Sequence, residues 1–366
     1  MTTYLDANAA EPLRPAARAA LAAALEETGN PASVHAAGRA ARRILEDARE
    51  GLAARFGARP GELIFVSGGT EADALAVHAF GAGRRVIIGA TEHDAVRAAA
   101  PEAVLLPVDR DGVADLDSLA HLLGAGGLAL VSLMLANNET GVLQPIAEAA
   151  LLCRRFGALL HVDAVAAAGR VEIDFSRLGA TSLALSSHKL GGPAGAGALL
   201  VASEAAGFFR PLIEGGGQER GRRGGTPPVA AIAAFAAAAE AAATDAAAAN
   251  LAEFRDAAER AAVAEGALVC GAGAKRLANT SSLALPGIKA ETQVIALDLA
   301  GVAVSAGAAC SSGKVSESHV LRAMGLGALA GQAIRVSLPW NATRADVARF
   351  AGAYGDMAGR LLRPAA

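Results

Sequence analysis

Short apolar runs recur along the first part of the chain and alternate with stretches of helical pattern. They are rich in Val, Ile and Leu and cover residues 62–66, 84–89, 103–108, 128–134, 158–162, 182–186 and 198–202. Apolar and polar residues scarcely alternate within them, which is typical of strands that are covered on both faces. The pattern predicts an α/β fold with a largely parallel sheet of seven strands between helices.

Helices are expected between the strands, for example at 15–27, 38–56 and 145–156. The first and last of these ranges begin with proline, which is favoured in the first turn of a helix. The alanine-rich stretch 227–264 predicts one or two long helices that connect two domains. Beyond it we expect a smaller α+β domain. Its strands are predicted at 281–286, 294–301 and 333–340, and its closing helix begins at Thr343, with Asp346 placed to complete the cap.

Composition narrows the class of protein. The chain has 366 residues, of which 53% are hydrophobic and 19% charged, as expected for a globular protein of two domains or one large one. The net charge of −3 offers no basic surface for nucleic acid. The apolar run 229–239 stops at Glu240, short of the roughly 20 residues that a membrane span needs. Asp6 and Glu11 stand where a signal peptide would be basic and then apolar, so we expect a cytosolic protein.

The three cysteines give no sign of a disulfide framework or a zinc site. Cys153, Cys270 and Cys310 are far apart in the sequence and form no CxxC pair. Each is therefore expected to be a free thiol, and no metal site is predicted.

Candidate chemistry lies where strands end, because ligands of open α/β sheets bind beyond the carboxyl ends of the strands. Ser67-Gly68-Gly69-Thr70 follows the first run and precedes a helix, so its backbone N–H groups could bind an anion such as phosphate. It matches neither a Walker loop nor GxGxxG. On its own, a glycine turn is more often only a turn.

Two ionisable residues follow other strands. Asp163 comes after 158–162 and Lys189 after 182–186. Taken singly, such an aspartate is more often a helix cap and such a lysine is usually solvated. A desolvated lysine, however, can act as a nucleophile toward carbonyls. An anion site, an acidic partner and a lysine on one sheet are the three groups that pyridoxal phosphate needs, which makes that cofactor the leading hypothesis.

Six motifs, in this order, resemble those of the cysteine desulfurases. They are TxH at 91–93, NNETG at 137–141, HVDA at 161–164, SSHK at 186–189, GGGQERGRRGGT at 215–226 and SAGAACSSG at 305–313. With YLDANAAEP from residue 4 and RVSLPW up to residue 340, the resemblance covers nearly the whole chain. It implies the type I fold of pyridoxal-phosphate enzymes, class V aminotransferase branch, and a homodimer. The large cofactor domain would be 12–245, and the small domain 1–11 with 246–366.

The resemblance also implies how the cofactor, pyridoxal 5'-phosphate, is held. Lys189 would form a Schiff base with it, Asp163 would pair with the pyridine nitrogen, and His93 would stack on the ring and help to move protons. Asn138 would hydrogen-bond the phenolic oxygen. The residues that would bind the phosphate are Gly69, Thr70, Ser186, His188 and, from the other subunit, Thr226.

Substrate binding and sulfur transfer follow from the same resemblance. Arg335 would bind the carboxylate of L-cysteine bidentately, with Asn138 nearby, and Asn30 is a further candidate for the wall of the site. Cys310 lies among small polar residues and resembles the catalytic cysteine of the long-loop desulfurases. It would attack the substrate sulfur and carry the persulfide to an acceptor, which could be an iron–sulfur scaffold, a sulfur carrier or a tRNA-modifying enzyme, while the other product is L-alanine. Cys153 and Cys270 are expected to be buried core residues.

Three other functions remain open at this point: a selenocysteine lyase, another class V aminotransferase, and a non-catalytic scaffolding subunit. An aminotransferase would have no use for the Cys310 loop, and a scaffold would be expected to lack Lys189 or Cys310.

One position departs from the family pattern. Ala166 stands where relatives usually have a glutamine that donates to the phenolic oxygen of the cofactor, so one hydrogen bond to the cofactor is expected to be missing.

Overall fold

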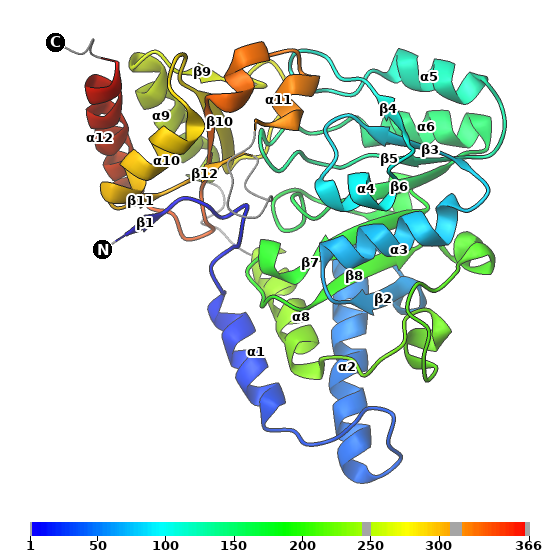
Figure 1. Ribbon diagram of the computed structural model, residues 1–366. Coiled ribbons are helices and arrows are strands. Elements are labelled where there is room, and N and C mark those ends of the chain that lie inside the picture. Colours follow the sequence, from blue (N-terminus) through cyan, green and yellow to red (C-terminus); the bar gives the residue numbers. More distant parts are fainter. Residues whose placement is uncertain (1, 244–249, 308–316, 363–366) are drawn as a thin grey trace.

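A mainly parallel sheet of seven strands forms the centre of the larger part of the protein (Figure 1). The computed structural model describes residues 2–243, 250–307 and 317–362. The strand order is β2-β8-β7-β6-β5-β3-β4, and only β8 runs antiparallel to its neighbours. The strands are β2 Leu63–Val66, β3 Arg85–Gly89, β4 Val104–Leu106, β5 Ala129–Ser132, β6 Leu159–Asp163, β7 Ser182–Ser186 and β8 Gly197–Val201. Each predicted run overlaps one of these strands, so the prediction of the sheet is confirmed.

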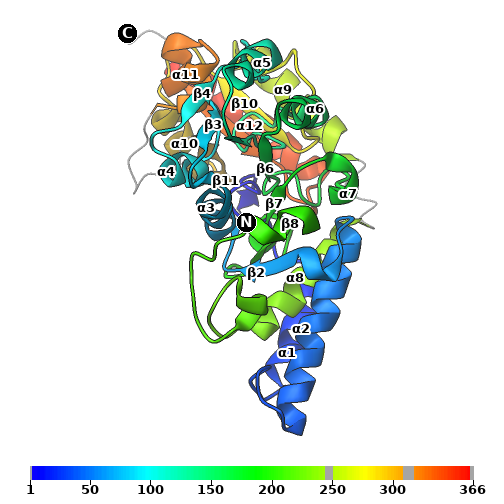
Figure 2. The same ribbon diagram turned by 90° about the vertical axis from the view of Figure 1, so that its right-hand side faces the viewer.

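Helices cover both faces of this sheet (Figures 1 and 2). In β2, Leu63 and Phe65 pack in one apolar cluster with α2, α5, α6 and α8, whereas Ile64 and Val66 pack in another with α3. Successive side chains of a strand point to opposite faces, which is why all of them must be apolar here. The helices of this part are α1 Pro15–Leu25, α2 Ala36–Arg55, α3 Gly69–Gly81, α4 Asp94–Ala99, α5 Leu116–Gly124, α6 Ile146–Phe156, α7 Phe175–Leu178 and α8 Val229–Ala243.

A second, antiparallel sheet of four strands lies in the C-terminal part, in the order β12-β13-β10-β9. The N-terminal strand β1 (Thr3–Tyr4) pairs with β11 (Val302–Ala303), so both ends of the chain contribute to this part (Figure 1). Leu5 and Phe350 are fully buried in its apolar core. The remaining elements are β9 Leu268–Val269, β10 Thr280–Ala284, β12 Ser305–Ala306, β13 Ala333–Ser337, α9 Leu251–Ala264, α10 Ala290–Leu299, α11 His319–Ala323 and α12 Arg344–Leu361.

One predicted strand is wrong. Residues 294–301 lie mostly in helix α10, whose buried residues Ala290, Gln293 and Leu297 have helical spacing, while Ile295 and Leu299 are exposed. A short apolar run fits either structure, and here the residues before 294 extend the helical pattern.

Other expectations for this half of the chain agree with the structure. Helix α12 begins with the capping box of Thr343 and Asp346, and the alanine-rich stretch forms the two helices α8 and α9. The predicted domain boundary at 245/246 falls within 244–249, outside the described residues, and the two domains remain a prediction.

Among the helices of the described ranges, none combines the length and the apolar character that crossing a membrane requires.

Candidate active site

A cavity of about 260 Å³ opens at the carboxyl ends of β2, β6 and β7, where the strand-end argument placed the chemistry. The structure brings nine of the predicted residues together in its lining: Gly69, Thr70, His93, Asn138, Asp163, Ser186, His188, Lys189 and Arg335. These residues come from segments that are distant in sequence, and only the folded sheet makes them neighbours.

The glycine turn after β2 forms one wall of the cavity. Its Gly69 opens helix α3, where the first N–H groups have no partner within the helix. A Cβ atom on Gly69 would lie 2.6 Å from Val165 Cγ2, so the position needs glycine. Ser67 N–H donates to Glu71 Oε2 over 2.8 Å, which fixes the turn. The turn can therefore present N–H groups to an anion.

Two polar side chains flank this turn from the end of β7. Ser186 Oγ lies 3.0 Å from His188 Nδ1. Burial, together with the charge of Lys189, lowers the pKa of His188 to about 4. The imidazole is therefore neutral near pH 7 and contributes a hydrogen-bonding group rather than a positive charge.

Asp163 ends β6 at the floor of the cavity. Its Oδ1 accepts a hydrogen bond of 2.8 Å from Val165 N–H, which fixes the turn after β6; no helix begins there, so Asp163 is not a helix cap. Burial and the nearby Asp73 raise the pKa of Asp163 to about 7. A cationic ring nitrogen beside this carboxyl group would lower that pKa and be stabilised in turn.

Sequence reasoning missed Asp73, which also lines the cavity. Burial raises its pKa to about 7. Its Oδ1 lies 3.1 Å from His161 Nε2, and His161 Nδ1 lies 2.9 Å from Ser182 Oγ. Burial lowers the pKa of His161 to about 4, so the ring is neutral. A signal existed, because Asp73 stands about one helical turn after Thr70 and faces the same side of α3.

Lys189 projects toward the N-terminal segment of the chain. Its Nζ donates to the carbonyl oxygens of Asn8 at 2.5 Å and Ala9 at 3.0 Å. Asn8 is buried, and its Nδ2 donates to the carbonyl oxygen of Asn138 and to Thr280 Oγ1. Asn8 belongs to the quoted YLDANAAEP motif, although no role was predicted for it.

Arg335 and Asn138 are neighbours, as the resemblance implies. Arg335 Nη1 donates to the Asn138 carbonyl oxygen over 3.1 Å, and Arg335 Nη2 lies 2.7 Å from Asp6 Oδ1. The guanidinium group is almost fully buried. The ion pair with Asp6 was not predicted.

His93 caps helix α4 and also lines the cavity. Its Nδ1 accepts from Ala95 N–H over 3.1 Å. In a neutral imidazole the proton must then be on Nε2, which leaves that nitrogen as a donor.

Three predicted residues are not in this lining. Asn30 is exposed between α1 and α2, and its Oδ1 accepts from Ala32 N–H. Thr226 is exposed as well. Cys310 lies outside the described residues. Ala166 does line the cavity, with no polar side chain at the position where the family usually has glutamine.

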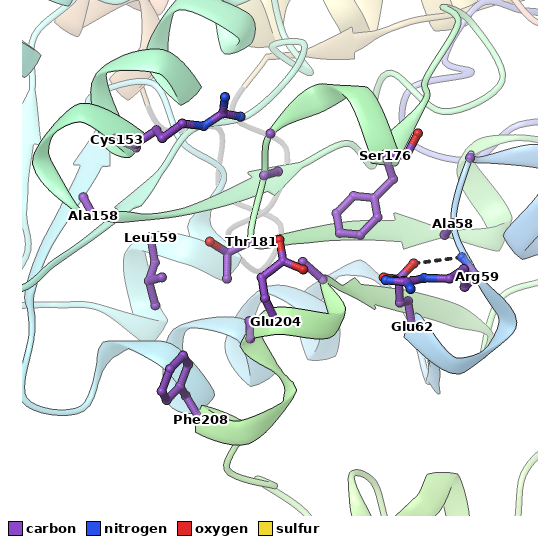
Figure 3. Close-up of a pocket in the computed structure, with 17 residues that line it drawn as sticks. Ala58, Arg59, Glu62, Cys153, Ala158, Leu159, Ser176, Thr181, Glu204 and Phe208 are labelled. Carbon is purple, nitrogen blue, oxygen red and sulfur yellow. Dashed lines mark hydrogen bonds and ion pairs between the residues drawn. The ribbon is translucent and has the colours of Figure 1, made fainter.

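A second and larger cavity, of about 590 Å³, lies at the opposite edge of the sheet, near the start of β6 and β7 (Figure 3). Its lining includes Cys153 and the ion pair of Arg59 with Glu62, at 2.6 Å, but none of the predicted site residues. Burial raises the pKa of Cys153 to about 12 and that of Cys270 to about 11. Both thiols are buried, free and protonated near neutral pH, as expected for core cysteines.

A glycine turn that can present N–H groups to an anion, a strand-end aspartate and a lysine surround one cavity, and these are the groups that pyridoxal-phosphate enzymes use to hold their cofactor. Residues 3–350 match the family described as Aminotransferase class-V, and the chain belongs to this pyridoxal-phosphate-dependent family, among its NifS/IscS-like cysteine desulfurases. It is 38% identical to the "IscS-like cysteine desulfurase" of Mycobacterium tuberculosis, over 94% of this chain and 93% of that protein. It is 42% identical to a "Cysteine desulfurase" of Cereibacter sphaeroides, over 95% and 93%. A solved NifS-like protein from Rickettsia africae matches with a TM-score of 0.88 and 31% identity, over 98% of this chain and 99% of that one.

Proposed function

We propose that the chain binds pyridoxal phosphate in the 260 Å³ cavity and converts L-cysteine into L-alanine, leaving the sulfur as a persulfide on Cys310. The observation that carries the proposal is the convergence of Lys189, Asp163 and the turn at Gly69 on one cavity that also contains Arg335. No single one of these residues would be specific.

The donor set fits the cofactor. The turn at Gly69 and Thr70, with Ser186 and His188, would hold the phosphate, and Thr226 of a second copy would complete this site in a homodimer. Asp163 would pair with the ring nitrogen, and Lys189 would attach the cofactor. When bound, pyridoxal phosphate supplies an electron sink that stabilises negative charge at the substrate Cα.

The protein residues would then bind the amino acid and move its proton. Arg335 would hold the α-carboxylate through parallel N–H donors. The amine of Lys189, held at the carbonyl oxygens of Asn8 and Ala9, would take the Cα proton. His93, whose Nδ1 accepts from Ala95 N–H, would assist proton transfer through its Nε2.

Cys310 would perform the sulfur step. Its thiolate attacks the substrate sulfur, so that an S–S bond forms while the bond between Cβ and sulfur breaks with its electron pair left on the carbon. Protonation of that carbon gives alanine. The persulfide would then pass to an acceptor protein, such as an iron–sulfur scaffold or a sulfur carrier.

The test is to mix the purified protein with L-cysteine and a reductant and to measure alanine and sulfide. We expect the two products in equal amounts, together with a change in the visible absorption of the cofactor. Amino-group transfer from L-cysteine to a keto acid, with 3-mercaptopyruvate formed in place of alanine and sulfide, would replace the proposal with an aminotransferase.

A further inference from the structure

Arg335, the residue proposed to bind the substrate carboxylate, already forms an ion pair with Asp6 inside the protein. Arg335 Nη2 lies 2.7 Å from Asp6 Oδ1, and the two side chains are 5% and 20% exposed. Arg335 Nη1 donates to the Asn138 carbonyl oxygen. Arg335 Nε is buried and has no hydrogen-bond partner. Arg335 is one of the residues that line the cavity.

The backbone around Asp6 is fixed by bonds that do not involve its carboxylate. Ala7 N–H donates to the Ser337 carbonyl oxygen at 3.0 Å, on the strand β13 that also carries Arg335. Asn8 N–H donates to Ser337 Oγ, also at 3.0 Å. The blue N-terminal segment accordingly lies beside this C-terminal strand (Figure 1). Removing the carboxylate therefore leaves the segment, and the acceptors of Lys189, in place.

A guanidinium group has five N–H donors, and a carboxylate bound bidentately uses two of them on adjacent nitrogens. Asp6 and the Asn138 carbonyl each take one donor of Arg335, from Nη2 and Nη1. Each Nη has two N–H donors, so one further donor remains on Nη1 and one on Nη2, and these two nitrogens can bind a carboxylate together.

We propose that Asp6 is a positioning residue: with the Asn138 carbonyl, it holds the guanidinium of Arg335 so that the remaining N–H donors of Nη1 and Nη2 are available for the α-carboxylate of the amino-acid substrate. This inference rests on the proposed function, since it concerns the same site. A second carboxylate near Arg335 also repels the substrate carboxylate, which acts in the opposite direction. The geometry favours positioning, since Asp6 contacts a single nitrogen of the buried guanidinium and leaves donors for a second carboxylate.

The experiment compares Asp6→Ala and Asp6→Asn with the wild-type holoenzyme. For Asp6→Ala we expect the KM for L-cysteine to rise about 10-fold to 100-fold, the range for losing a hydrogen bond to a charged group, with kcat within about 3-fold because Lys189 keeps its acceptors. The Asn variant retains an acceptor oxygen and should recover part of the loss. The control is Glu253→Gln, which removes an exposed ion pair with Arg344 and should change neither constant.

A second readout separates this inference from the proposed function. L-Alanine, which has no sulfur to lose, is titrated into each holoenzyme while the visible absorption of the cofactor is followed. Its dissociation constant should rise in Asp6→Ala by the same factor as the KM. If the wild type does not release sulfide but this rise is seen, the proposed function fails and the inference stands. An unchanged or lower KM and dissociation constant in Asp6→Ala, or a KM in Asp6→Asn no lower than that in Asp6→Ala, would overturn the inference.

Discussion

Asp163→Asn is predicted to stabilise the cofactor-free protein at alkaline pH. In the folded protein burial holds the pKa of Asp163 at about 7, against an ordinary value of 3.8. Since the folded state binds this proton more tightly than the unfolded state, the group favours folding below pH 4, and that contribution is lost as the pH rises through 7. The difference corresponds to about 4 kcal/mol at pH 8. Asparagine carries no charge and avoids this cost.

The assay is urea unfolding of both cofactor-free proteins at equal concentration between pH 4 and pH 8. We expect equal free energies of unfolding near pH 4 and an advantage of about 2 to 4 kcal/mol for Asp163→Asn at pH 8. Some pH dependence should remain, because Asp73 also has a raised pKa. With pyridoxal phosphate bound the order should reverse, since the cofactor ring loses its ionised partner.

A matched control uses an aspartate whose pKa shifts the other way. Hydrogen bonds from Ser118 and from the backbone lower the pKa of the exposed Asp115, which caps helix α5. The ionised carboxylate of Asp115 therefore stabilises the folded state above its ordinary pKa, and this contribution is lost on acidification. Asp115→Asn should thus bring no gain in the free energy of unfolding at pH 8. If Asp163→Asn proves less stable than the wild type at pH 8 without cofactor, or if the pH dependence is unchanged, the reasoning about the buried carboxyl group is wrong.

Three further predictions concern the chemistry. Borohydride should fix the cofactor to Lys189, and Lys189→Ala should lose the adduct; trapping on another lysine would contradict the assignment. Mixing Lys189→Ala chains with Thr226→Val chains should restore part of the activity, because one site of each heterodimer has both intact residues, whereas a fully active monomer would rule out a shared site. After reaction with L-cysteine, mass spectrometry under non-reducing conditions should find one extra sulfur on Cys310; Cys310→Ala should still bind the cofactor but release only background sulfide, and the same mass increase on Cys153 would disprove the mechanism.

The sequence was sufficient to predict the central sheet and the position of its chemistry. Buried strands require long apolar runs, and the parallel strands β6 and β7 end at the same edge, so Asp163 and Lys189 could be expected to meet there. The turn at Gly69 was recognisable from its two glycines between strand and helix. Helix α10 could not be predicted from the sequence, because its short apolar run fits both the helical and the strand periodicity.

Contacts between distant segments could not be predicted in the same way. Lys189 and Asn8 are 181 residues apart, and Arg335 and Asp6 are 329 residues apart. Periodicity describes what one segment buries, but it carries no information on which segment it meets. The motif containing Asn8 and Asp6 was noticed, and only the folded chain shows that it reaches both the lysine and the arginine.

The pairing of the first residues with β13 also determines when the site can be completed during synthesis. Asp6 and Asn8 are translated long before their partners Arg335 and Ser337, from which 329 residues separate each of them. The central sheet, complete at Val201, can form long before then. The lysine and the glycine turn can therefore be in place before Arg335 has been translated. The ion pair of Asp6 with Arg335, and the proposed binding of substrate by that arginine, must wait for the synthesis of β13.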